Sequence, residues 1–401
     1  MGMLIAEIDL NLMFLEPKQF LSTSLVFGAE IGLEFGFDVL FFCPVLQTFG
    51  HGIGINYGQI ANNLPSPSRV ALLVQSLSIK KVKLYDADPN VLSAFSSYDV
   101  EFIVGVGNEN ILNMMDPTKA QAWLKEHIQP YIPQTKITCI TVGNEVFSGN
   151  DTNLMSNLLP AMQSLHGALV SLGLDSQVNI STAHSLAILS NSYPPSAGSF
   201  RPDLTGYIQP LLNFHAQIKS PFLINAYPYF AYKANPNQVS LDYVLFEPNA
   251  GMTDANTNLK YDNMLYAQID SVYSAIKAMG HTDIEIKISE TGWPSKGDSD
   301  EVGATPENAG KYNGNLLQRI AENQGTPMKP SVPVDIYVFA LFNEDLKPGP
   351  VSERNYGLFY PDGTPVYNIG LSGYLQQLSS AYRTVAASIL GFLITIAAFL
   401  I

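Results

Sequence analysis

Short apolar runs alternate with longer amphipathic stretches through the middle of the chain. Eight of the short runs are rich in β-branched and aromatic side chains, as buried strands are. They span residues 53–57, 81–85, 101–106, 137–142, 177–182, 222–227, 284–289 and 335–342. Stretches with apolar residues at helical spacing lie between them, for example 153–172, 262–279 and 306–323.

This alternation predicts an α/β fold in which eight parallel strands close into a (β/α)8 TIM barrel, built as a single domain. Pro117 and Pro306 stand where two of the helices would begin, since a missing N–H costs least in the first turn. An open doubly wound sheet is the competing architecture, and it normally carries a Gly-rich phosphate loop after its first strand. Residues 58–65 read Gly-Gln-Ile-Ala-Asn-Asn-Leu-Pro, which is not such a loop.

The two ends of the chain differ from the middle. Residues 385–401 are apolar and uncharged, a pattern typical of a cleavable GPI-attachment signal, although a tail anchor or a packed helix remains an alternative. Residues 1–51 hold six acidic residues, one base (Lys18) and an apolar run at 39–49. We therefore expect a signal, targeting or atypical N-terminal extension at 1–51, the barrel domain at 52–379, and a hydrophobic tail at 380–401.

Composition excludes several classes of protein. With 35 acidic and 21 basic residues the net charge is −14, which argues against nucleic acid as a partner. Two cysteines exclude a disulfide scaffold, and Cys139, within an apolar run, is expected to be a buried small side chain. No clustered His or Asp motif predicts a metal site. Asn150 begins an Asn-Asp-Thr sequon and could be glycosylated.

Carboxylates and aromatics follow several of the predicted strands. Glu145 comes after the fourth run, Glu290 after the seventh and Glu344 after the eighth, while Tyr85 and Tyr227 end the second and sixth. The C-terminal strand ends of a barrel form one face, so these side chains should line one pocket. Two facing carboxylates can cleave a glycosidic bond, one as proton donor and the other as nucleophile or base.

Other interpretations of these residues remain open. Glu145 could be an acid at a helix N-terminus, but Glu290 occupies the matching position after another strand. Glu109 repeats the tetrapeptide Val-Gly-Asn-Glu after the third run and is expected to be structural or at the rim. His184, near the fifth strand end, is expected to contact substrate or to be a satisfied polar group rather than a catalyst.

Five segments carry a family resemblance: 53–58, 142–145, 289–295, 339–344 and 353–362. They resemble the plant β-1,3-glucanases of glycoside hydrolase family 17, in the GPI-anchored form without a C-terminal cysteine-rich glucan-binding module. The resemblance implies a retaining mechanism with Glu145 as acid/base and Glu290 as nucleophile, their carboxyl groups about 5–5.5 Å apart.

The same resemblance implies roles for neighbouring residues. Glu344 and Lys347 would surround the nucleophile, and the lysine would lower the pKa of Glu290. Asn144 would contact the sugar 2-hydroxyl, while three aromatic side chains would line the groove. These three are Tyr85, Tyr227 and Trp293.

The expected activity is endo-hydrolysis of (1→3)-β-D-glucosidic linkages in a callose-like β-1,3-glucan. Mixed-linkage β-1,3;1,4-glucanase activity, transglycosylation and non-catalytic binding of wall glucan remain alternatives. We expect no cofactor and no metal, a monomer, and contact with the membrane only through a lipid anchor. The expected location is secreted, at the outer face of the plasma membrane and in the cell wall.

Overall fold

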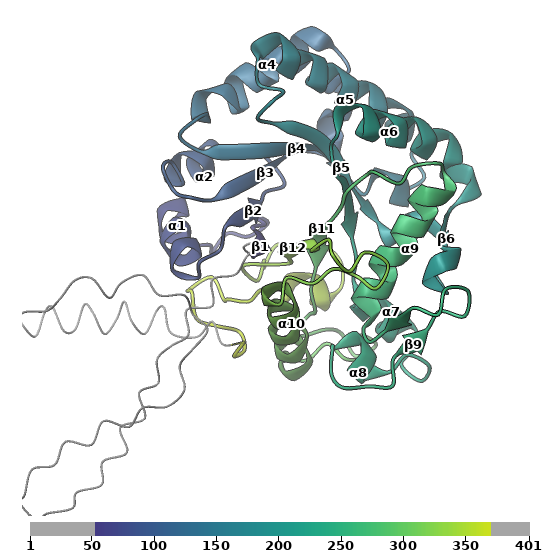
Figure 1. The fold of residues 1–401 in the computed structure, drawn as a ribbon. Coiled ribbons are helices and arrows are strands. Elements are labelled where there is room, and N and C mark those ends of the chain that lie inside the picture. The colour runs from purple at the N-terminus through teal and green to yellow at the C-terminus, as the bar shows by residue number, and fades with distance from the viewer. Residues whose placement is uncertain (1–52, 370–401) are drawn as a thin grey trace, which may run out of the picture. The chain divides into compact units, whose positions relative to one another are not determined.

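The computed structural model describes residues 53–369 (Figure 1). The predicted N-terminal extension and hydrophobic tail lie outside these residues, as does the boundary at 379. Between 53 and 369, no helix combines the length and apolar character needed to cross a membrane.

Eight parallel strands close into a barrel, and each strand pairs with its neighbours in chain order. They are β1 (Gly54–Asn56), β2 (Lys81–Lys83), β3 (Glu101–Val106), β4 (Lys136–Asn144), β5 (Asn179–Ser185), β8 (Phe222–Asn225), β11 (Ile286–Thr291) and β12 (Asp335–Val338). Each of the eight predicted runs supplies one strand, and the predicted barrel is confirmed. The run at 177–182 is displaced, because β5 begins only at Asn179 and continues to Ser185.

Helices surround the barrel (Figure 1). They are α1 (Pro67–Ser76), α2 (Pro89–Ala94), α3 (Ile111–Met114), α4 (Pro117–His127), α5 (Thr152–Leu172), α6 (Thr205–Ile218), α7 (Pro228–Ala234), α8 (Leu241–Val244), α9 (Met264–Ala278) and α10 (Pro306–Ala321). The three predicted helices correspond to α5, α9 and α10, and Pro117 and Pro306 are the first residues of α4 and α10. Asp116 and Thr305 cap these two helices by accepting backbone N–H groups.

Two small antiparallel sheets lie outside the barrel and were not predicted. One pairs β6 (Leu189–Asn191) with β7 (Ser199–Phe200), and the other pairs β9 (Met252–Thr253) with β10 (Lys260–Tyr261). Strands of two or three residues are too short to give a periodic signal. Both sheets belong to the long connections that follow β5 and β8.

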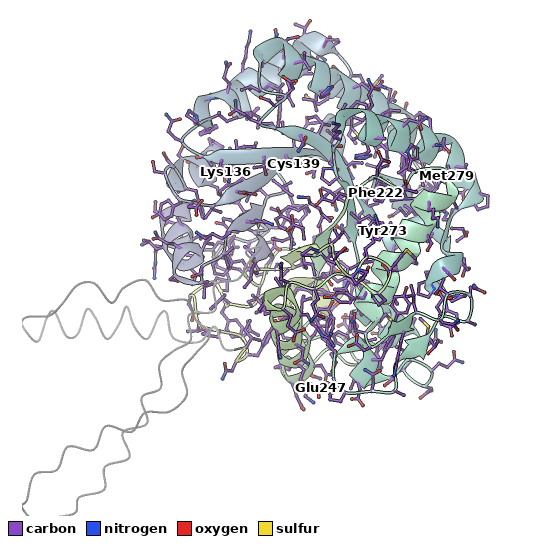
Figure 2. All side chains as sticks on the ribbon, viewed as in Figure 1. Lys136, Cys139, Phe222, Glu247, Tyr273 and Met279 are labelled. Atoms are coloured by element: carbon purple, nitrogen blue, oxygen red, sulfur yellow. The ribbon has the colours of Figure 1, made fainter. Side chains whose placement is uncertain are left out.

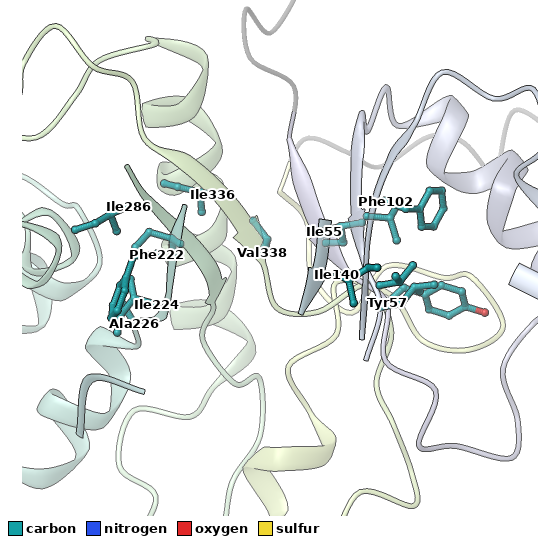
Figure 3. Close-up of a cluster of buried hydrophobic side chains, with 14 of the residues drawn as sticks. Ile55, Tyr57, Phe102, Ile140, Phe222, Ile224, Ala226, Ile286, Ile336 and Val338 are labelled. Atoms are coloured by element: carbon teal, nitrogen blue, oxygen red, sulfur yellow. The ribbon is translucent and has the colours of Figure 1, made fainter. Parts of the chain in front are cut away.

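Alternate residues of the strands face the helices and form the main core. Ile55, Phe102, Ile140, Ile224 and Val338 belong to this buried cluster, as Figure 3 shows on both sides of the barrel. Burying one aliphatic or aromatic side chain of this kind contributes about 1.5–3 kcal/mol. The inner faces of the same strands are thus free to carry polar groups.

The barrel interior is ionic at the N-terminal end of the strands. The Asp335 carboxylate forms salt bridges with two lysines: Oδ1 lies 2.6 Å from Lys81 Nζ, and Oδ2 lies 2.9 Å from Lys287 Nζ. Burial alone would raise the pKa of Asp335, but these two ammonium groups outweigh it and lower that pKa. Farther in, Ile103, Cys139 and Tyr337 form a small apolar cluster, and Cys139 is a buried free thiol, as expected (Figure 2).

His184 on β5 is neither a substrate contact nor a satisfied polar group, so that expectation is wrong. Its ring is fully buried between the rings of Phe147 and Phe222, with centroid distances of 5.3 and 4.7 Å. Neither ring nitrogen has a hydrogen-bond partner among residues 53–369. Burial lowers the pKa of His184 to about 3, so the ring is neutral in the folded chain.

His184→Phe should therefore stabilise the protein, and increasingly so in acid. Below a pH of about 6.5 the unfolded chain binds a proton at this ring, whereas the folded chain does not until about pH 3. The histidine therefore destabilises the fold as pH falls through that window. We expect a gain in unfolding free energy of about 1 kcal/mol at pH 7.5, growing to about 3 kcal/mol at pH 5. Urea titrations at both values measure it.

The same substitution at the partly exposed His127 provides the control, since its ring reaches solvent. A gain at His184 that does not grow as the pH falls would show that the ring takes up a proton in the folded chain.

Candidate active site

A bulge in β11 turns Glu290 into the barrel. Ile286 and Ile288 face the helices, so strict alternation would send residue 290 outward as well. The pairing register shifts after Ile288 against both β8 and β12. Glu290 therefore enters the interior, where it is 6% exposed, while Thr291 faces outward and meets the hydroxyl of Tyr312.

Three donors hold the Glu290 carboxylate. Lys83 Nζ lies 2.9 Å from Oε1, the Tyr85 hydroxyl donates to Oε1 at 2.7 Å, and the Tyr227 hydroxyl donates to Oε2 at 2.9 Å. Burial by itself would raise the pKa of Glu290, but the charge of Lys83 and the bonds from Tyr85 and Lys83 outweigh it and lower that pKa. Glu290 is thus ionised near neutral pH.

Glu145 follows directly after β4 and has an unusual backbone. Gly143 and Glu145 both have positive φ, at 68° and 53°. At Gly143 a Cβ atom would stand 2.8 Å from Asn108 Oδ1, so this turn requires glycine. Asn108 also accepts from the Asn144 backbone N–H at 2.8 Å, and the Glu145 N–H donates to the Ala183 carbonyl at 2.8 Å. These bonds fix the direction in which the Glu145 side chain leaves the strand.

Asn225, at the end of β8, connects the two glutamate-bearing strands. It is 2% exposed, and its Nδ2 donates to Glu145 Oε1 at 2.8 Å and reaches Asn144 Oδ1 at 3.5 Å. Its Oδ1 accepts from the Ser289 hydroxyl at 2.6 Å. Asn225 thus holds Glu145 and Asn144 from across β5, which lies between β8 and β4, and sequence analysis missed it.

The two glutamates have opposite shifts in pKa. Burial raises the pKa of Glu145, the negative charge of Glu290 raises it further, and the bond from Asn225 offsets only part of this. The two carboxyl groups therefore interact electrostatically. The proton is favoured on Glu145, while Glu290 carries the negative charge. A pair poised in this way can act as acid and nucleophile.

Glu344 and Lys347, from the loop after β12, both interact electrostatically with Glu290, and the charge of Lys347 lowers the pKa of that carboxyl group, as predicted. Glu344 is 4% exposed, and its Oε1 accepts from the Ile60 N–H at 2.8 Å. Lys347 Nζ pairs with Glu353 at 3.1 Å and lies 4.2 Å from the ring centroid of Phe339. Lys347 makes only a lesser contribution to lowering the pKa of Glu290. The lysine that contacts this carboxylate is Lys83, not Lys347.

Trp293 does not line the groove, contrary to expectation. Its side chain is fully buried, and its indole N–H donates to the Gly303 carbonyl at 2.8 Å. The ring packs against Tyr229 and Tyr312, at centroid distances of 5.1 and 5.6 Å. Trp293 therefore anchors the loop after β11 in the core. Tyr85 and Tyr227 do enter the site, where their hydroxyls contact the nucleophile candidate.

The remaining predicted positions lie around the site or away from it. Glu109 is exposed on a short helical turn after β3, where it accepts from the Asn110 side chain at 3.1 Å. It borders an open cavity of about 490 Å³ that also contacts Tyr85 and Trp123. Asn150 is exposed just before α5. Among residues 53–369, no group of His, Cys, Asp and Glu side chains is arranged to hold a metal ion.

Replacing Lys83 should show which cation keeps Glu290 ionised. In Lys83→Met the carboxylate loses a buried ammonium at 2.9 Å, so the pKa of Glu290 should rise. Lys347→Met is the matched control and should raise it less, because Lys347 pairs with Glu353 instead. A 13C-NMR titration of the glutamate carboxyl carbons measures both shifts. An equal or larger shift in Lys347→Met would contradict this assignment.

Known proteins share both this sequence and this architecture. The family model described as glycosyl hydrolases family 17 matches residues 53–371. Glucan endo-1,3-beta-glucosidase 14 of Arabidopsis thaliana is 65% identical over 342 residues, which cover 85% of this chain and 87% of that protein. Glucan endo-1,3-beta-glucosidase 11 of the same species is 58% identical, over 82% of this chain and 78% of that protein.

A solved structure gives the same result. CJP38, a beta-1,3-glucanase and allergen of Cryptomeria japonica pollen, matches with a TM-score of 0.77 and 39% identity, over 80% of this chain and 99% of that chain. The family match extends across the whole described barrel, including β4 and β11 with their glutamates. The chain therefore belongs to family 17 of the glycosyl hydrolases.

Proposed function

We propose that this chain is an endo-β-1,3-glucanase that cleaves (1→3)-β-D-glucosidic linkages in callose-like glucan with retention of anomeric configuration. The observation that carries the proposal is that two glutamates at the C-terminal ends of the barrel strands interact electrostatically and have pKa values shifted in opposite directions. The relatives named glucan endo-1,3-beta-glucosidase supply the substrate class.

In the first step Glu290 would attack the anomeric carbon while Glu145 transfers its proton to the departing glycosidic oxygen. Attack needs an ionised carboxylate, which Lys83 and two tyrosine hydroxyls stabilise in a buried position. Proton transfer needs a protonated acid, which burial and the charge of Glu290 favour at Glu145. The result is a glucosyl ester on Glu290 and a shortened glucan carrying a new hydroxyl group.

In the second step the roles reverse. Glu145, now ionised, would take a proton from water as the water oxygen attacks the anomeric carbon and displaces Glu290. The raised pKa of Glu145 makes its carboxylate a stronger base than an ordinary glutamate. Asn225 Nδ2 donates to this carboxylate at 2.8 Å and keeps it in place, so Glu145 can act as the acid in the first step and as the base in the second.

Cavities beside the pair support a polymeric substrate. One of about 710 Å³ is bordered by Tyr57, Gln59 and Asp88, and the cavity of about 490 Å³ by Tyr85 and Asp88. The first is lined by segments that follow β1 and β2, and the second by segments that follow β2 and β3. An open, extended site of this kind suits cleavage within a chain rather than at its end.

Chemical rescue tests the assignment of the two glutamates. Glu290→Gln should lower hydrolysis of a linear β-1,3-glucan by at least about a thousandfold, because no nucleophile remains. Glu145→Ala should be slow on the same glucan, with or without azide, because the departing oxygen receives no proton. With a dinitrophenyl β-1,3-glucoside, whose leaving group needs no proton, this variant should form the glucosyl ester and recover turnover with azide, which needs no base to attack that ester. Recovery should be accompanied by a β-glucosyl azide product, identified by NMR.

Glu109→Ala is the matched control, since this glutamate repeats the same tetrapeptide but is exposed at the rim. Full activity of Glu290→Gln, or an α-glucosyl azide, would sink the assignment. Products from mixed-linkage glucan, and transfer products at high substrate concentration, distinguish the alternative activities on the same site.

We also infer that the mature protein is secreted and held at the outer face of the plasma membrane by a GPI anchor. The support is the uncharged apolar sequence of residues 385–401, which lies outside the described residues. In plant cells expressing the full chain, a phosphatidylinositol-specific phospholipase C should release the enzyme from intact membranes. Replacing two of these apolar residues, Leu393 and Ile394, with aspartate should abolish the anchored pool. An enzyme that stays on the membrane after the lipase is not GPI-anchored.

A further inference from the structure

A third cavity lies between the connection that precedes β8 and the connection that links β8 to β11. It has a volume of about 600 Å³, within the range of small-ligand sites. Its walls come from the segment after β6, from α7 and the start of α8, and from β9 and α9, which Figure 1 shows grouped at one side of the barrel. Within residues 53–369, none of its lining side chains is hydrogen-bonded to Glu145 or Glu290.

The lining of this cavity carries no charged side chain, in a protein whose net charge is −14. Its polar groups are neutral amides and hydroxyls, including Gln238, Asn249 and Gln268. A phosphate, a nucleotide or a metal ion would find no counter-charge there. The lining instead suits a neutral ligand with many hydroxyl groups.

Aromatic, aliphatic and small side chains complete the wall, and the aliphatic ones include Val239, Met252 and Met264. Tyr193 lies on the cavity and is 69% exposed, the largest exposed fraction among the large apolar and aromatic side chains of the described residues. Tyr243 also lines the cavity, while the small side chains of Ala231 and Ala267, and Gly251, leave space beside the tyrosine rings. Flat aromatic rings bind the C–H faces of pyranose units, and small neighbouring side chains let such a unit approach the ring.

The cavity is held open by bonds made before any ligand arrives. Asn249 Nδ2 donates to two carbonyls, those of Glu247 and Asp262, at 2.7 and 2.9 Å, and Asn249 Oδ1 accepts from the Gly251 N–H at 2.7 Å. On the other wall, the Ser196 N–H and hydroxyl both donate to buried Asp254, each at 2.8 Å. Because these loops are already fixed, binding would cost little ordering entropy.

Two polar atoms of the lining still lack partners. The Tyr243 hydroxyl and Gln268 Oε1 are buried, and neither forms a hydrogen bond within residues 53–369. An unpaired buried polar atom costs about 1–3 kcal/mol. The terminal torsion of glutamine is soft, so Gln268 can turn its amide toward a hydroxyl group in the cavity.

We propose that this cavity is a second binding site for glucose units of a β-glucan, remote from the bond that is cleaved. The inference rests on the proposed function for its choice of ligand, and on the uncharged, amide-lined cavity with its exposed tyrosine for its location. Helix α7 lines the cavity through Ala231 and begins directly after Tyr227, which contacts Glu290. A glucan held in the cavity would therefore be tethered close to the cleavage site, which raises its effective concentration there.

The test compares polymer binding with turnover of a short substrate. In a Glu290→Gln background, Tyr193→Ala should weaken sedimentation with insoluble linear β-1,3-glucan roughly fivefold, the loss expected for one stacking contact. Gln268→Leu keeps the side-chain size but removes the amide, and should also weaken binding. In the active enzyme, Tyr193→Ala should raise the ratio of KM for soluble glucan to KM for a β-1,3-linked pentasaccharide by a similar factor. Val170→Ala, at another exposed apolar position on α5, is the control and should change neither quantity.

Three outcomes would overturn the inference. If the unmutated chain hydrolyses glucan but both variants bind the polymer as tightly as their parent, the second site fails and the proposed function stands. Tighter binding in Gln268→Leu would show that the cavity takes an apolar ligand. If the unmutated chain does not hydrolyse glucan and Glu290→Gln does not sediment with it, the proposed function and the second site both fail.

Discussion

The buried contact between Lys83 and Glu290 is the interaction on which the rest of the site depends. A carboxylate that is 6% exposed would take up a proton unless a cation and donors compensate for lost hydration. Lys83 Nζ at 2.9 Å and the hydroxyls of Tyr85 and Tyr227 provide that compensation. The charge kept on Glu290 in turn helps to hold the proton on Glu145, so one ion pair sets both ionisation states.

The barrel can hold this buried ion pair because each strand has an outer face that packs against the helices and an inner face that does not. Apolar side chains on the outer face carry the hydrophobic core, so the inner face can hold charges without loss of packing. Local departures from regular strand geometry then aim the glutamates. The bulge after Ile288 turns Glu290 inward, and positive φ at Gly143 and Glu145 ends β4 at the point where Asn225 can reach the carboxyl group.

The sequence predicted the barrel well because each strand and helix is a local pattern. It predicted that Glu145 and Glu290 line the same pocket, because the C-terminal ends of the strands form one face of a barrel. Lys83 was missed, although a signal exists: Lys81, Lys83 and Tyr85 alternate with Val82 and Leu84, which places all three on the inner face. The bulge in β11 has no such signal, since alternation alone directs residue 290 outward. Trp293 was misplaced because a large aromatic beside a glutamate fits a groove and a core equally well in sequence.

The central claim is that Glu290 attacks the sugar while Glu145 donates the proton, and covalent trapping tests it most directly. A 2-deoxy-2-fluoro β-1,3-linked glucoside with a fluoride leaving group slows release of the glucosyl ester more than its formation. After proteolysis, mass spectrometry should find the fluorosugar on the peptide that contains Glu290, and Lys83→Met should form this adduct more slowly. An adduct on Glu145 or Glu344, or turnover with inverted configuration and no adduct, would contradict the account.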